Sequence, residues 1–256
     1  MEPTSVAAPV RLPAVYATDA DELFDGLATL AAALQGAGEV APFILVGIGY
    51  ERSNHAELLR LRDFLTPAIR THLRPLIERA AFESGAPPGG LQEISETTGA
   101  AEFLQFIREE LIPHIEGHHP AKASARGYFG YSAGATFGLY TLFKAPDTFE
   151  KYLLGSPSTS YGGHHYGIDL GNSWTEQQTS DALIYLSVGE LEEEGTERAP
   201  FELVTGFHKL VQFLNGAARP PFRVQAEVFP KETHATAWAL AFARGLRATL
   251  PTRRSS

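Results

Sequence analysis

Apolar runs and amphipathic stretches alternate along the chain and predict strands and helices in turn. The run at 43–49 is apolar almost without interruption, as is typical of a parallel strand covered on both faces. Leucines recur at helical spacing from Leu23 to Leu34. By the same patterns we expect strands at 13–18, 43–49, 127–131, 152–155, 182–188 and 222–229. The expected helices are 23–34, 100–116, 133–142, 201–214 and 235–250.

Strands that alternate with helices predict an α/β fold, in which a mostly parallel sheet carries helices on both faces. A chain of 256 residues, 44% of them hydrophobic, can bury one such core, so we expect a single domain over 1–256. Residues 68–99 contain Pro75 and a cluster of glycine and proline at 85–90. We expect this stretch to form a lid or a plain surface excursion within the domain.

The pentapeptide GYSAG at 130–134 joins a predicted strand to a predicted helix with no loop residues between them. Ser132 therefore has to lie at a very tight strand-to-helix turn, which is the geometry of a nucleophile elbow. The flanking glycines leave room for this turn, and the following helix directs its positive dipole end towards the serine. The pentapeptide alone also occurs in ordinary turns, but the strand and helix around it favour a catalytic serine.

A serine hydroxyl needs a base to accept its proton, and the base needs a third group to orient it. His234 follows the last predicted strand and is the candidate base; taken alone it would better fit a surface loop, but the presence of Ser132 favours the base. An acidic run at 190–194 follows the strand before it and supplies the third group. Glu192 is our choice because a tight turn at Gly189 would return the chain to the strand end, and Glu190 is the alternative.

Two backbone N–H groups are expected to hold the oxyanion that forms during acyl transfer. The first belongs to Ala133, at the start of the helix that follows the serine. The second is expected in the loop after the first strand, from Ala20 or Asp21. Asp19 and Asp21 also suit the capping of the next helix, and capping does not exclude the other role.

Paired histidines occur at 118–119 and 164–165. Adjacent histidines on an extended chain point to opposite sides, and no histidine pair has helical ligand spacing with a carboxylate, so we expect no metal and no other cofactor. The loop around 164–165 suits either a substrate pocket or an ordinary aromatic surface loop. We assign to this pocket Tyr131, Tyr161, His165 and Tyr166, with Trp174 in the same loop.

The charge and composition exclude several classes of partner and chemistry. The formal net charge is −9, and the 21 Lys and Arg residues are scattered, which argues against nucleic acid and anionic membranes as partners. The absence of cysteine excludes disulfides, thiolate metal sites and a cysteine nucleophile. No signal-peptide pattern or membrane-length apolar run occurs, so we expect a cytoplasmic location by default. The sequence does not indicate the oligomeric state.

The chain resembles the putative-esterase family of α/β-hydrolases, which includes the trilactone siderophore esterases. The matching segments, in family order, are VYATDADELFDGL, ILVGIGY, LRDFLTP, EFLQFIREELIPHIE, GYSAGATFGLYTLFKAPDTFEKYLLGSPS, LSVGELE and FPKETHATAW. The resemblance implies that Ser132 is the nucleophile, His234 the base and Glu192 the acid. The family's usual strand pair ahead of the first matching strand is expected to be absent, because too few residues precede Ala14.

These observations predict a serine hydrolase that cleaves small-molecule carboxylic esters through an acyl-enzyme. The resemblance suggests a siderophore-type esterase as a narrower reading. Family tryptophans are replaced here by Thr159, Ser160 and Tyr161, so the identity of the substrate is not carried over. Two alternatives stay open: an acyltransferase of the same fold, in which an alcohol outcompetes water, and a non-catalytic binding protein of the same fold.

Overall fold

A computed structural model of the chain describes residues 10–50, 56–83, 85, 99–172, 181–195, 199–216 and 223–252. Within them, six strands form one sheet in the order β2-β1-β3-β4-β5-β6, and every neighbouring pair is parallel. The strands are β1 (Leu12–Ala17), β2 (Ile44–Gly47), β3 (Ala121–Tyr131), β4 (Lys151–Gly155), β5 (Leu183–Gly189) and β6 (Arg223–Phe229). The predicted α/β fold with a mostly parallel sheet is confirmed.

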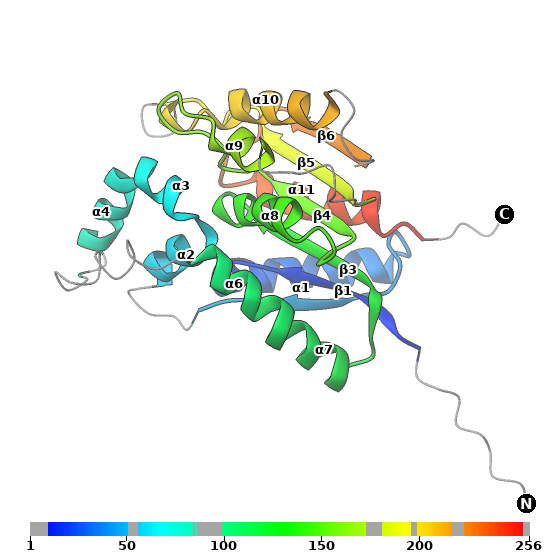
Figure 1. Cartoon of the computed structure of the whole chain (residues 1–256). Helices are drawn as coiled ribbons and strands as arrows, with labels where there is room; N and C mark the ends of the chain where they lie inside the picture. The colour runs from blue at the N-terminus through cyan, green and yellow to red at the C-terminus, as the bar shows by residue number, and fades with distance from the viewer. Residues whose placement is uncertain are drawn as a thin grey trace, which may run out of the picture.

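Helices cover both faces of the sheet (Figure 1). One face carries α1 (Ala20–Gly36) and α11 (Ala237–Thr249), which pack on Val15 and Phe129 of the strands. The other face carries the larger core. The helices on that side are α2 (Ala56–Phe64), α3 (Pro67–His72), α4 (Arg74–Glu83), α6 (Ala100–Phe106), α7 (Ile112–His118), α8 (Ala133–Lys144), α9 (Tyr166–Asn172) and α10 (Leu203–Asn215).

Side chains of the central strands are buried on both faces, which explains their continuous apolar runs. In β1, Ala14 and Tyr16 enter the larger core, whereas Val15 and Ala17 enter the core beneath α1 and α11. This alternation is the two-residue period of an extended chain. Ser132, Glu192 and His234, in contrast, all lie just beyond the strand ends.

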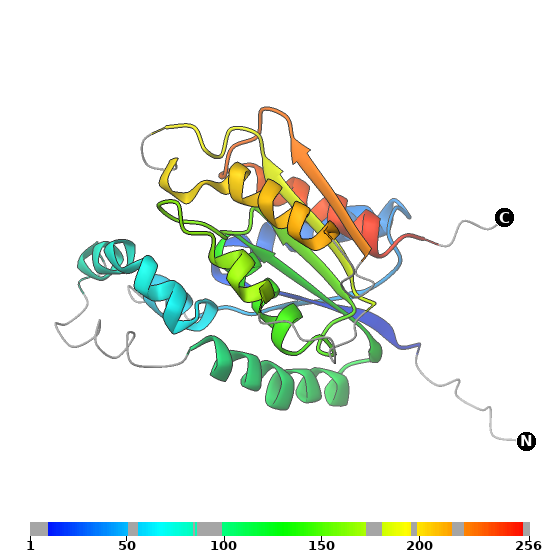
Figure 2. The same ribbon diagram turned by 45° about the horizontal axis from the view of Figure 1, so that its top comes forward.

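The excursion expected at 68–99 can be compared with the structure at 68–83, 85 and 99. There the chain forms helices rather than irregular loops, and both views show α3 and α4 projecting away from the sheet (Figure 2). Leu73 and Ile77 are nevertheless buried, because this arm returns apolar side chains towards the larger core. The rest of the stretch lies outside the described residues, and the division into domains stays a prediction.

Two elements differ from their expected form. The helix expected at 100–116 is broken by a π-helical turn, Ile107–Leu111, because Pro113 lacks the N–H that an α-helical bond to residue 109 needs. The strand before the elbow is longer than expected and begins at Ala121. No helix in the described part of the chain combines the length and apolar composition that a membrane span requires.

Candidate active site

Ser132 forms a sharp turn between the end of β3 and the start of α8. Its backbone has φ 56° and ψ −120°, a conformation that a residue with a side chain adopts only under strain. The Ser132 N–H donates to the carbonyl of Gly155 at 2.9 Å, and the Ser132 carbonyl accepts from the N–H of Thr136 at 3.1 Å. Bonds to β4 and to the first turn of α8 therefore hold the strained residue in place.

The two glycines of the pentapeptide are needed for space. A Cβ on Gly130 would lie 2.4 Å from the carbonyl oxygen of Gly134, so the turn could not close. A Cβ on Gly134 would lie 2.5 Å from Thr18 Oγ1 and 3.0 Å from Asp19 Oδ2. The second glycine thus lets α8 approach the loop after β1, which brings Asp19 to the serine side of the sheet.

His234 lies in the turn between β6 and α11 and is held from three sides. Its Nδ1 is 2.6 Å from Glu192 Oε2. The hydroxyl of Tyr131 donates to the His234 carbonyl at 2.7 Å, and the Tyr131 ring packs on the imidazole with 4.8 Å between centroids. Because Glu192 occupies Nδ1, the free ring nitrogen for proton transfer is Nε2.

Glu192 is buried, with 1% of its surface exposed, and its carboxylate is fully used. Oε1 accepts from the Gly189 N–H and from Ser156 Oγ, both at 2.6 Å, while Oε2 faces His234. The Glu192 N–H bonds the Gly189 carbonyl at 3.3 Å, which is the tight turn expected from the sequence. The alternative acid, Glu190, is turned elsewhere and accepts from the Lys231 N–H at 2.8 Å.

Ser132 and His234 line one cavity of about 580 Å³. Within the described part of the chain, the Ser132 hydroxyl makes no hydrogen bond and faces this cavity. Catalytic hydrogen bonds to such a hydroxyl commonly form only when substrate is present. The arrangement can therefore pass a proton from the serine to Nε2 and hold the resulting positive charge against the buried Glu192.

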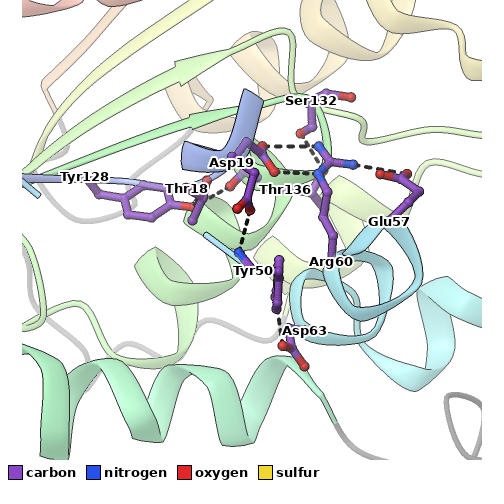
Figure 3. Close-up of polar contacts among 11 residues, drawn as sticks. Thr18, Asp19, Tyr50, Glu57, Arg60, Asp63, Tyr128, Ser132 and Thr136 are labelled. Atoms are coloured by element: carbon purple, nitrogen blue, oxygen red, sulfur yellow. Dashed lines mark hydrogen bonds and ion pairs between the residues drawn. The ribbon is translucent and has the colours of Figure 1, made fainter. Parts of the chain in front are cut away.

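Arg60 is a further residue of the site that the sequence reasoning missed. Its Nε and Nη2 contact the two carboxylate oxygens of Asp19 at 2.5 and 3.2 Å, and both residues line the cavity with Ser132. Figure 3 shows the guanidinium between Asp19 and Glu57, with Ser132 beside it. Burial alone would lower the pKa of Arg60, but Asp19 and Glu57 outweigh burial and raise the pKa above its ordinary value.

The residues expected to hold the oxyanion line two different hollows. Ala133, at the start of α8, lines the cavity. The Ala20 N–H is already used, because it donates to the Ile48 carbonyl at 3.1 Å. Ala20 and Asp21 face a separate hollow, and Asp21 accepts from the Tyr50 N–H at 2.5 Å. The Ala20 N–H is thus not free to hold the oxyanion, and Asp19, rather than Ala20 or Asp21, lines the cavity with Ser132. A second donor from this loop stays a prediction.

Of the four residues assigned to a substrate pocket, Tyr131 lines the cavity and three do not. Tyr166 is buried, and its hydroxyl lies 2.9 Å from Ser158 Oγ. His165 contacts Ser160 and Lys209, and Tyr161 packs edge-on against a phenylalanine of the 3₁₀ turn Ala199–Phe201. Tyr166 and Tyr161 thus contact the lining residues Ser158 and Phe201 without lining the cavity themselves. Trp174 lies outside the described residues.

Groups of three or more side chains that could hold a metal ion do not occur among the described residues. His118 bonds the carbonyl of His114 through Nδ1, and His164 stacks on His72 with 3.8 Å between centroids. Each of the two histidine pairs, 118–119 and 164–165, thus has at least one member engaged in packing or backbone contacts.

A family model described as "Putative esterase" matches residues 75–249. The chain belongs to this esterase family. The ferri-bacillibactin esterase BesA of Bacillus subtilis (strain 168) is 30% identical over 255 residues, which cover 97% of this chain and 82% of the relative. The esterase is accordingly a serine hydrolase that cleaves carboxylic esters. The relatives do not favour an acyltransferase or a non-catalytic protein.

Solved structures agree with the fold of this esterase. Siderophore hydrolase EstB from Aspergillus nidulans superposes with a TM-score of 0.73 at 20% identity, covering 94% of this chain and 83% of the other. The BES protein from Bacillus cereus gives a TM-score of 0.71 at 22% identity and covers 97% and 86% of the two chains. At these identities the likeness concerns the α/β-hydrolase fold.

Proposed function

We propose that the esterase hydrolyses its substrate through an acyl-enzyme on Ser132, with His234 as the base and Glu192 as the acid that orients the base. The observation that carries this proposal is the buried Glu192 carboxylate on His234 Nδ1, at 2.6 Å, beside the cavity that holds the strained serine. A serine alone, or a histidine alone, would not need such an acid.

In the first half of the reaction, His234 Nε2 takes the proton of Ser132 Oγ as the oxygen attacks the ester carbonyl. The bond from the carbonyl carbon to the alcohol oxygen then breaks, and Nε2 gives its proton to the departing alcohol. In the second half, a water molecule loses a proton to Nε2 and attacks the acyl-enzyme. The acid leaves and Ser132 recovers its proton from Nε2.

The negative charge on the carbonyl oxygen is held from two sides in this proposal. The Ala133 N–H, at the positive end of α8, supplies one donor. Arg60 supplies the other, since its guanidinium is fixed by two contacts to Asp19 and lines the same cavity. Fixed donors of this kind stabilise the transition state by about 3 kcal/mol each, because they need no reorganisation during the reaction.

The natural substrate proposed first is a siderophore-type ester, a choice supported by the siderophore esterases to which the chain is similar. Purified enzyme would be incubated with a tri-catecholate trilactone, with and without iron, and the released acids would be counted by mass spectrometry. Hydrolysis of either form supports this substrate class. Hydrolysis of simple aryl esters with no cleavage of either trilactone excludes it.

A fluorophosphonate probe tests the nucleophile directly. We expect one covalent adduct, located by peptide mass spectrometry on Ser132, and parallel loss of ester hydrolysis. The Ser132→Ala variant should take up no probe while keeping its circular dichroism spectrum. An adduct on another serine, or unchanged hydrolysis after complete labelling of Ser132, contradicts the proposed mechanism.

A further inference from the structure

The described walls of the active-site cavity carry more negative than positive charge. Four carboxylates line it against two guanidinium groups, a balance of 2 − 4 = −2. The carboxylates are those of Asp19, Glu22, Glu57 and Glu83, and the guanidinium groups are those of Arg60 and Arg79. A substrate that enters this cavity therefore meets an acidic lining on a chain whose own net charge is −9.

Both arginines of the lining already contact carboxylates, so neither adds a net positive charge to the cavity. Arg60 forms a two-point contact with Asp19, and its Nη1 lies 3.5 Å from Glu57. Arg79 Nε lies 2.8 Å from Glu83. Glu22, in contrast, has no cation in contact among the described residues, and more than half of the Glu57 side chain is exposed. The surplus negative charge is thus presented to whatever approaches.

The same cavity also has an aliphatic lining. Much of it comes from the segment that carries α2 to α4 and from the start of α10, and it includes Leu61, Leu65, Leu73, Leu76, Ile77 and Leu203. An apolar wall lowers the local dielectric response and so strengthens the repulsion between the carboxylates and a bound anion. It also offers no donor that could replace the water around a buried charge.

We infer that the substrate is an uncharged or cationic ester with an aliphatic part, and that strongly anionic esters, including an iron(III) tris-catecholate, are rejected by the lining. This inference rests on the proposed function, because it concerns the specificity of the same cavity. Glu22 and Glu57 are its specificity-determining residues, since Glu22 has no cation in contact among the described residues and Glu57 shares the single charge of Arg60 with Asp19.

The test uses three esters of the same acyl group and the same shape of alcohol. One is a choline ester, one has carbon in place of the quaternary nitrogen, and one carries a sulfonate. We expect kcat/KM for the cationic ester to exceed that for the anionic ester by about tenfold or more at low ionic strength, with the uncharged ester between them. Added salt should shrink this ratio, because it screens the exposed carboxylates.

Variants assign the effect to the cavity. The double change Glu22→Gln and Glu57→Gln should lower the cationic-to-anionic ratio by about three- to tenfold, with each rate expressed relative to the uncharged ester of the same variant. Glu78→Gln removes one charge from α4 outside the cavity, where Glu78 pairs with Arg74, and should leave the ratio unchanged. An equal change in all variants would overturn the assignment to these residues.

The outcomes separate this inference from the mechanism. Labelling of Ser132 by an uncharged fluorophosphonate together with equal or better hydrolysis of the anionic ester would overturn the inference and leave the mechanism standing. Faster cleavage of an iron-loaded than of an iron-free tri-catecholate would also overturn it. Failure of all three esters together with absent labelling would instead reject the mechanism.

Discussion

Two regions of the structure each contain one serine, one histidine and one glutamate. The elbow set is Ser132, His234 and Glu192, and the buried set is Ser160, His165 and Glu202. Both histidines have a close partner on Nδ1, since Glu192 Oε2 and Ser160 Oγ each lie at 2.6 Å. Residue types and short distances therefore do not distinguish the two sets.

The second ring nitrogen distinguishes them. In the buried set, His165 Nε2 lies 2.5 Å from Lys209 Nζ and 3.8 Å from Glu202 Oε2, so neither ring nitrogen is free. The serine of this set is also fully buried, with 0% of its surface exposed. In the elbow set the acid, not the serine, is buried, and the serine faces a cavity with Nε2 still available.

The difference shows what a hydrolytic site requires beyond its residue types. The acid has to be sealed from water so that it orients the imidazole, and the serine has to be exposed to the substrate. The elbow achieves this by placing a side chain at a strained φ of 56°, above the sheet. The buried set has the opposite arrangement, which suits a structural contact between α9, α10 and the chain after β4.

The sharpest way to separate the two sets is to remove each serine. Ser132→Ala should lower kcat for a short-chain aryl ester by about 10⁴-fold or more, because the nucleophile is gone, while thermal unfolding is little changed. Ser160→Ala should keep kcat within about threefold but lower the free energy of unfolding by about 1–2 kcal/mol, because a buried hydrogen bond is lost. A comparable loss of kcat in both variants would contradict the distinction.

Substitution of the acids at 190–194 is expected to give the next largest effect on kcat. Glu192→Gln should lower kcat by about 10³- to 10⁴-fold, because an amide cannot hold the imidazolium that forms during proton transfer. It should also destabilise the fold by about 1–3 kcal/mol, since the Gly189 and Ser156 donors lose a charged acceptor. Glu190→Gln is the matched control and should keep kcat within about twofold, as the Glu190 carboxylate accepts from the Lys231 N–H and does not contact His234.

The parts of this site that the sequence could indicate are those fixed by the sheet. Parallel strands end at a common edge, so the residues after β3, β5 and β6 had to lie near one another, and Glu192 and His234 are in contact there. Their catalytic roles stay a proposal. The choice between Glu192 and Glu190 depended only on a tight turn at Gly189, a local feature that sequence can suggest.

Arg60 could not be found in the same way, because its place depends on how α2 docks on the sheet. In the sequence it is one charged residue of an ordinary amphipathic helix, 41 positions from Asp19. The error over Ala20 has a similar origin. Asp19 adopts a left-handed conformation, φ 59°, which turns the Ala20 N–H towards Ile48. The local sequence does not predict this conformation.

Arg60 allows a third test, with an expected effect of about 10²- to 10³-fold on kcat. Arg60→Lys keeps the charge but cannot contact both oxygens of Asp19 at once, so the cation is no longer fixed beside Ser132. Arg126 offers a matched control, because its Nε and Nη2 contact Glu116 in the same way, at 2.6 and 3.1 Å, away from the cavity. Arg126→Lys should change stability but not kcat.

A fall in kcat of equal size in Arg60→Lys and Arg126→Lys would mean that the loss comes from destabilisation of the fold. KM should be measured as well. A donor that acts on the transition state lowers kcat and kcat/KM together, whereas a residue that only shapes the cavity raises KM.

Substitution of Gly134 and of Gly206 is expected to have the smallest effect, and it compares the surroundings of Ser132 and Ser160 most specifically. A Cβ on Gly134 would lie 2.5 Å from Thr18 Oγ1 and 3.0 Å from Asp19 Oδ2, while a Cβ on Gly206 would lie 2.6 Å from Ser160 Oγ and 2.9 Å from Thr159 Oγ1. Each glycine lies in a helix, so alanine gains about 1 kcal/mol of helix propensity against an overpacking cost of about 1–3 kcal/mol.

We therefore expect Gly134→Ala and Gly206→Ala to lower the midpoint of urea unfolding by similar, small amounts. In Gly134→Ala the new Cβ crowds Thr18 and Asp19, and Thr18 is held in place because its Oγ1 lies 3.3 Å from the Tyr128 hydroxyl. We expect Asp19 to move instead, and its movement displaces Arg60, which it contacts. Turnover should fall by about tenfold in Gly134→Ala alone, because a small displacement of a fixed donor is costly in an active site. If Gly206→Ala lost the same turnover, the set of Ser160, His165 and Glu202 would have to belong to the catalytic machinery, and the full burial of Ser160 would need another explanation.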